Sequence, residues 1–116
     1  MSYWGAGPDE CDFSFSAIGV AVLRLKRKMY EDIEGVQEDN FSEQSIIASL
    51  VCLRLIGQEF PNNLNVHFRK RDYLTVKKDF YAWYENSKNK IPKKYQAGVL
   101  KEAEEEFKKW ESSELI

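Results

Sequence analysis

Apolar side chains recur at steps of three and four residues over much of the chain, the spacing that places them on one face of an α-helix. The first such stripe comprises Phe15, Ile18, Val22, Leu25, Met29 and Ile33. Ser14 or Asp12 can cap its start, and Gly35 suits the left-handed conformation that ends many helices. The pattern predicts a first helix near residues 14–34.

A second segment, residues 46–56, is apolar almost without interruption up to Arg54. Asn40 and Glu43 have the spacing of a capping pair, and a glycine follows the run directly. We predict a second helix near residues 41–56. Because it is apolar on nearly all sides, we expect it to be the central and most buried element. A buried strand is the alternative, which the length of the run disfavours.

Turn-forming residues separate this helix from two further stripes. Residues 57–71 contain glycine, proline and asparagine, so we expect a loop, with a short turn of helix or an extended piece at residues 66–68 as alternatives. Asp72 can cap a third helix that reaches about residue 86, and Pro92 suits the first turn of a fourth. The third stripe comprises Tyr73, Val76, Phe80 and Tyr84, and the fourth Tyr95, Val99, Ala103, Phe107 and Trp110. Four glutamates of the last helix, Glu102, Glu104, Glu105 and Glu106, are expected to face water.

These patterns predict an all-α fold: a compact single-domain bundle of four or five short helices. Glycines and a proline forbid regular structure near the start, so we expect an irregular N-terminal segment at residues 1–12 and a helical body at residues 13–116. A chain of 116 residues with 14% aromatic side chains can form a stable core without disulfides or bound metals. The charged fraction of 31% favours a well-solvated surface on a folded domain.

The apolar run at residues 46–53 is too short to cross a bilayer, so we expect no membrane partner. Acidic residues stand near the start of the chain where a signal peptide would be apolar. We therefore expect a cytoplasmic protein in which Cys11 and Cys52 are reduced.

Candidate chemistry is sparse. His67 is the one histidine, and no metal-binding motif of the Cys-x-x-Cys or His-Glu-x-x-His type is present, so we expect no metal and no cofactor. A nucleophilic site would need Cys11 or Cys52 beside His67. We interpret Cys52 as a small buried hydrophobe, Cys11 as an inert side chain and His67 as a loop residue held by a local hydrogen bond. The sequence therefore predicts that the protein is not an enzyme.

The opening segment Trp4-Gly5-Ala6-Gly7-Pro8, followed by acids that lead into a helix, resembles an uncharacterised bacterial domain family that begins with Trp-Gly-x-Gly-Pro. The resemblance covers about the first twenty residues and implies no catalytic residues. In size and acidity the chain is also similar to small immunity proteins that neutralise bacterial toxin domains. That likeness implies a protein-binding role.

Charge is sorted along the chain although the net charge is only −2. Residues 31–65 hold seven acids against one base, Arg54, whereas residues 66–100 hold nine bases against three acids. Two regions of opposite electrostatic potential on one small protein influence which partners bind and how fast they associate.

The acidic stretch predicts a partner-binding surface. Its residues are Glu31, Asp32, Glu34, Glu38, Asp39 and Glu43. Several of them lie near the end of the first helix, where the helix dipole disfavours negative charge, so local stability does not explain them. They favour a basic protein partner, for which a toxic nuclease domain is a natural candidate, and hence an immunity or antitoxin-like inhibitor. A solvated segment without a partner is the alternative.

The basic stretch supports a second hypothesis, an RNA-binding or single-stranded nucleic-acid-binding module over residues 69–95. Its candidate contacts are Arg69, Lys70, Arg71, Lys77 and Lys78. Lysines and aromatic residues interleave here, as phosphate and base contacts require. The acidic net charge and the need for Tyr73 and Tyr84 in the core argue against this hypothesis.

Overall fold

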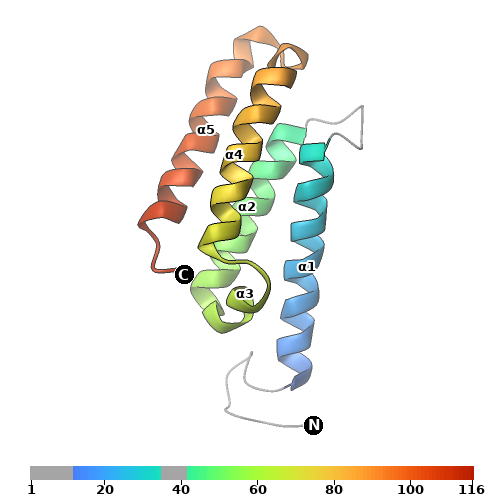
Figure 1. The fold of residues 1–116 in the computed structure, drawn as a ribbon, viewed down its shortest axis with the longest axis vertical. Coiled ribbons are helices and arrows are strands. Elements are labelled where there is room, and N and C mark those ends of the chain that lie inside the picture. Colours follow the sequence, from blue (N-terminus) through green and yellow to red (C-terminus); the bar gives the residue numbers. More distant parts are fainter. Residues whose placement is uncertain (1–11, 35–41) are drawn as a thin grey trace.

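The computed structural model describes residues 12–34 and 42–116, and these are almost entirely helical (Figure 1). The elements are α1 (Asp12–Glu34), α2 (Ser42–Glu59), α3 (Pro61–His67), α4 (Lys70–Ser87), the 3-10 turn η1 (Lys88–Lys90) and α5 (Lys93–Ser112). No strand occurs in these two ranges, and the predicted all-α fold is confirmed. The predicted irregular N-terminal segment lies, except for its last residue, outside the described residues.

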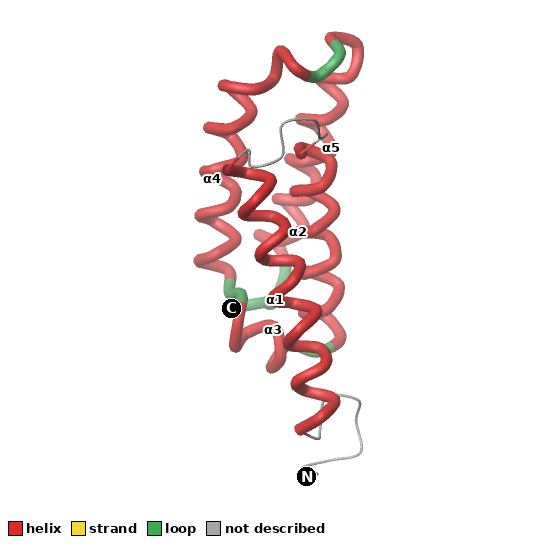
Figure 2. The backbone as a smooth tube through the Cα atoms, turned by 90° about the vertical axis from the view of Figure 1, so that its right-hand side faces the viewer, coloured by secondary structure: helices red, strands yellow, loops and turns green. Residues whose placement is uncertain are grey.

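The helices form two antiparallel pairs, α1 with α2 and α4 with α5, and the short α3 crosses one end (Figures 1 and 2). Helix α2 contacts α1, α3, α4 and α5, so the prediction that it is the central element is confirmed. The four long helices run roughly along one direction, so side chains from all of them meet in a single core.

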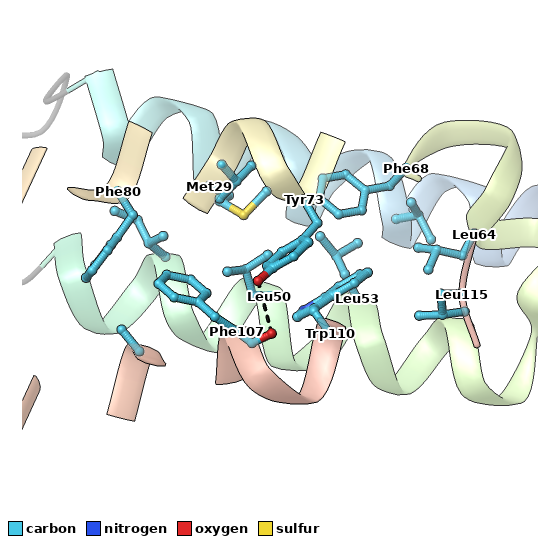
Figure 3. Close-up of a cluster of buried hydrophobic side chains, with 14 of the residues drawn as sticks. Met29, Leu50, Leu53, Leu64, Phe68, Tyr73, Phe80, Phe107, Trp110 and Leu115 are labelled. Carbon is cyan, nitrogen blue, oxygen red and sulfur yellow. Dashed lines mark hydrogen bonds between the residues drawn. The ribbon is translucent and has the colours of Figure 1, made fainter. Parts of the chain in front are cut away.

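Aromatic rings fill the space between α4 and α5 and the helices behind them (Figure 3). Trp110 is fully buried and stacks on Tyr73 with ring centroids 5.3 Å apart, while Phe68 meets it edge-on at 5.5 Å. Phe80 and Phe107 extend the cluster along the bundle, 5.6 Å apart. These rings stand at the predicted stripe positions of α4 and α5, apart from Phe68, and each buries a large apolar area.

The outer face of α2 is exposed, which corrects the prediction that this helix is buried on nearly all sides. Ala48 and Cys52 are exposed and Leu55 is 49% exposed, because the neighbouring helices cover only the opposite side. The prediction that Cys52 is a buried hydrophobe is therefore wrong. A search of the described helices found none with a stretch both long and apolar enough to cross a membrane.

Helix α2 also continues past its predicted end. Gly57 was expected to stop the helix but lies buried inside it, and the last helical residue is Glu59. A methyl group on Gly57 would lie 2.4 Å from Leu64 Cδ2 and 3.0 Å from both methyls of Leu115. The glycine is thus required for the close approach of α3 and the C-terminal segment, not for a turn.

We expect Gly57→Ala to destabilise the protein. Fitting the methyl against two buried leucines costs about 1–3 kcal/mol, which exceeds the gain in helix propensity of up to about 1 kcal/mol. Gly98→Ala in α5 is the matched control, because no atom lies within 4 Å of the added carbon, and it should stabilise the protein by about 0.5–1 kcal/mol. Urea denaturation of both variants measures the difference, and equal shifts would contradict the packing described for Gly57.

The segment predicted as a loop contains α3, the short-helix alternative. Pro61 occupies its first turn, where the missing N–H costs nothing, and the backbone of Phe68 is extended just beyond its end. Helix α4 then begins at Lys70, two residues before the predicted cap. Asp72 still caps this helix, but from the third position of its first turn, where its Oδ2 accepts a hydrogen bond from the N–H of Arg69 at 2.8 Å.

Candidate functional site

Three of the acidic residues, Glu31, Glu34 and Glu43, belong to the adjoining ends of α1 and α2. Glu31 and Glu34 belong to the last turn of α1, Glu43 is the second residue of α2, and antiparallel packing brings these two helix ends together (Figure 1). Glu31 is partly exposed. Glu38 and Asp39 lie outside the described residues, as do the side chains of Glu34 and Glu43. We call these five residues the acidic end.

Asp32 does not belong to the exposed surface, which corrects the sequence prediction. Its side chain is fully buried, and its Oδ1 accepts a hydrogen bond from Lys28 Nζ at 3.0 Å, one helical turn earlier. It stands three residues after the buried Met29, on the inward side of α1. An acid in this position is part of the packing and is not accessible to a partner.

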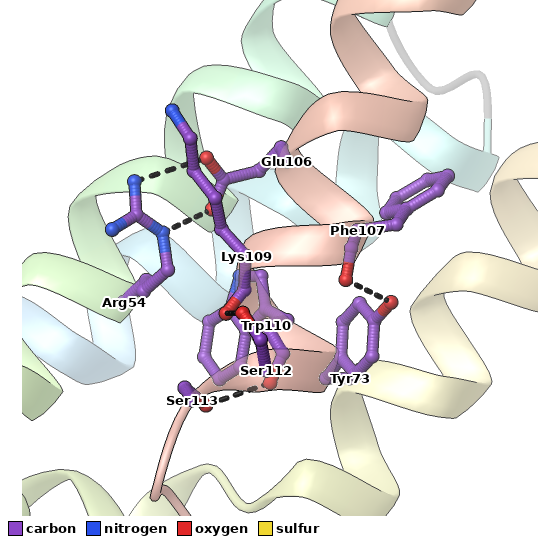
Figure 4. Close-up of polar contacts among 8 residues, drawn as sticks. All are labelled: Arg54, Tyr73, Glu106, Phe107, Lys109, Trp110, Ser112 and Ser113. Atoms are coloured by element: carbon purple, nitrogen blue, oxygen red, sulfur yellow. Dashed lines mark hydrogen bonds and ion pairs between the residues drawn. The ribbon is translucent and has the colours of Figure 1, made fainter.

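Arg54, the one base in the acidic stretch, is buried in an ion pair that joins α2 to α5 (Figure 4). Its Nε lies 2.6 Å from Glu106 Oε2 and its Nη2 lies 3.1 Å from Oε1, with the side chains 10% and 4% exposed. The expectation that Glu106 faces water is wrong, because it borders the stripe that carries Ala103 and Trp110 into the core. The one indication of this ion pair in the sequence is that Arg54 interrupts an apolar run, since a charged side chain buried at that position needs a partner of opposite charge.

The ion pairs that the structure describes for the basic stretch are made with acids outside residues 31–65. Lys77 pairs with Glu111 of α5 at 2.7 Å, and Lys88 of η1 pairs with Glu85 of α4 at 3.2 Å. Among the side chains that the structure describes, a set that leaves out Glu34, Glu38, Asp39 and Glu43, no ion pair joins an acid of residues 31–65 to a base of residues 66–100.

Two of the five basic residues of the nucleic-acid hypothesis donate hydrogen bonds within the protein. Lys70 donates to the carbonyls of Glu111 at 3.1 Å and Ser113 at 3.0 Å, where it binds the end of α5. Arg69 Nε donates to the Asn65 carbonyl at 2.9 Å. Arg71 and Lys78 lie exposed on the outer face of α4. Of the aromatic residues proposed beside them, Tyr73 and Tyr84 are buried, whereas Tyr95 is 55% exposed.

Lys77, Tyr73 and Glu111 form a network that ties α4 to α5. The Tyr73 hydroxyl donates to the Phe107 carbonyl at 3.0 Å and to the Glu111 carboxylate, to which Lys77 also donates at 2.7 Å (Figure 4 shows the first of these). Burial and the Glu111 carboxylate raise the pKa of Tyr73, and the hydrogen bonds from Lys77 and Tyr73 lower the pKa of Glu111. The lowered pKa means that the network stabilises the fold above the ordinary carboxyl pKa and loses this contribution as the pH falls through the lowered value.

His67 is the last residue of α3 and not a loop residue. Its carbonyl accepts a hydrogen bond from Lys26 Nζ at 3.0 Å, and its Nε2 would lie 3.3 Å from a methyl group on Gly19 of α1. The hydrogen bond from Lys26 and the close approach of the His67 ring to Gly19 thus hold α3 against α1. Cys11 lies outside the described residues. Among the residues whose placement is described, no group of three His, Cys, Asp or Glu side chains is arranged to hold a metal ion.

The chain matches no protein-family model, no curated protein and no solved structure.

Proposed function

We propose that this protein is a non-catalytic inhibitor of the immunity or antitoxin type, which uses its acidic end to block a basic toxin domain in the bacterial cytoplasm. One observation supports this proposal most directly. Arg54, the one base among residues 31–65, is buried and paired with Glu106, so it cannot offset the acids at the end of α1 and α2.

Acids at the C-terminal end of a helix are unfavourable for the isolated protein. Glu31 and Glu34 stand in the last turn of α1, where the partial negative charge of the helix dipole repels them. A partner that supplies cations removes this repulsion on binding. Nuclease domains present such cations because they hold phosphates, and complementary fields accelerate their capture.

The likeness in size and acidity to small immunity proteins is in line with this role. A protein that works by occupying a partner's active face needs no reactive group of its own, which agrees with the sparse candidate chemistry of the sequence. The nucleic-acid alternative over residues 69–95, with its candidate contacts in α4, is less well supported as the main function, because Lys70 and Lys77 are engaged with α5.

The proposal predicts what the chain captures. We expect the immobilised protein to retain a basic protein from an extract of its native host, identified by mass spectrometry, and to inhibit that protein's activity in a purified assay. A variant with Glu38 and Asp39 changed to lysine should retain much less of it. Retention of acidic or neutral proteins alone, or equal retention by the variant, would contradict the proposal.

A further inference from the structure

The connection between α4 and α5 carries a concentrated positive charge that the proposed function does not use. Lys88, Lys90, Lys93 and Lys94 fall within seven residues, and of these only Lys88 has an ion-pair partner, Glu85, in the described part of the chain. Lys90, Lys93 and Lys94 are all exposed. Figure 1 shows that this connection projects beyond the ends of α1 and α2. We call these four lysines and Tyr95 the basic tip.

The tip is held in a fixed shape by contacts beneath it. The Gln96 amide donates to the carbonyls of Lys88 at 2.9 Å and Ile91 at 3.1 Å, while the Tyr84 hydroxyl donates to the Gln96 carbonyl at 3.2 Å. Ile91 is only 4% exposed and anchors the turn in the core. A surface ordered before binding loses less conformational entropy when it meets a ligand.

An aromatic ring stands among the lysines. Tyr95 is 55% exposed, and Lys94 Nζ lies 5.0 Å from the centre of its ring. The protein's other tyrosines in the basic stretch are buried or partly buried, so Tyr95 is the one that offers a free face. Exposed ammonium groups around an exposed ring match the two features of a single-stranded nucleic acid, its phosphates and its unpaired bases.

We propose that the basic tip binds single-stranded nucleic acid, with Lys90, Lys93 and Lys94 on phosphates and Tyr95 stacked on a base. In a nucleic-acid duplex the base faces are stacked and not accessible to Tyr95. An anionic membrane requires a larger apolar anchor than one tyrosine. Binding of an acidic peptide would use the lysines but would not require the tyrosine ring. The net charge of −2 is that of the whole chain, whereas the tip itself carries four lysines within seven residues, so its local charge favours phosphates. The acidic end takes no part in this site, so the two proposals stand or fall separately.

Fluorescence anisotropy with labelled 12-nucleotide oligo-U tests the proposal. We expect dissociation constants on the order of micromolar at low salt, and weaker binding to an RNA duplex and to phosphatidylserine vesicles. Changing Lys90, Lys93 and Lys94 to alanine should weaken binding at least tenfold and reduce the salt slope by about two, since each phosphate contact contributes about 0.7. The matched control changes Lys101, Lys108 and Lys109, three exposed lysines of α5, and should retain most of the affinity.

The ring is tested separately. Tyr95→Leu should weaken oligo-U binding about tenfold, whereas Tyr95→Phe, which keeps the stacking face, should bind as the unchanged protein does. All these residues are exposed, so circular dichroism should show unaltered thermal midpoints. The proposal is overturned by absence of oligo-U binding, by equal losses in the two lysine triples, by equal or tighter binding of duplex or vesicles, or by insensitivity to Tyr95→Leu.

Discussion

Replacing Arg54 by methionine should destabilise the protein by about 3–5 kcal/mol, because the change leaves the Glu106 carboxylate buried without its partner. Both side chains are at least 90% buried and share two hydrogen bonds, so removing the guanidinium leaves a carboxylate that has lost both its water and its partner. A loss of this size is a large fraction of the stability of a small domain. Urea denaturation at neutral pH measures it.

The double variant with Arg54 and Glu106 both changed to methionine is the decisive control. Removing both charges eliminates the uncompensated carboxylate, so most of the lost stability should return. Lys77→Met breaks the more exposed pair with Glu111 and should cost about 1 kcal/mol or less. A double variant as unstable as Arg54→Met alone would show that the shape of the two side chains, and not their pairing, holds α2 to α5.

Periodicity, the length of one apolar run and capping residues predicted the four long helices of this fold. The sequence predicted the buried residues of α4 and α5 correctly, because side chains at helical spacing all point to one face of the helix. Examples are Tyr73, Phe80, Phe107 and Trp110. The ends of elements were predicted less well. Glycine commonly ends a helix, so Gly57 was predicted to end α2. In the structure the absence of a side chain at Gly57 leaves room for Leu64, which only the tertiary arrangement reveals.

The errors at single residues share one cause, which is that a helix pattern does not say how much of its face the neighbours cover. Cys52 stands in the most apolar helix and is exposed, whereas Glu106 stands in the most acidic run and is buried. Asp32 belongs to an acidic cluster in the sequence and to the packed interior in the fold. Sorting of charge along a chain therefore predicts a charged region, but not which of its members reach the solvent.

The second large expected effect is on the rate at which the acidic end associates with its partner. With the partner recovered by capture, changing Glu38 and Asp39 to lysine should slow association at least tenfold at low ionic strength, because electrostatic steering raises association rates by about 10 to 1000-fold. Thermal stability should be nearly unchanged. The matched control changes Glu59 and Glu114, exposed acids at the opposite end of the bundle, and alters the net charge by the same amount.

The most direct test of the account is the dependence of the association rate constant on salt, followed by stopped-flow fluorescence for the unchanged protein and the two charge-reversal variants. We expect the rate constant of the unchanged protein and of the Glu59/Glu114 control to fall steeply as salt rises, and that of the Glu38/Asp39 variant to be low and nearly independent of salt. Equal rate constants and equal salt slopes for the unchanged protein and the Glu38/Asp39 variant would contradict the claim that the acidic end recognises a basic partner.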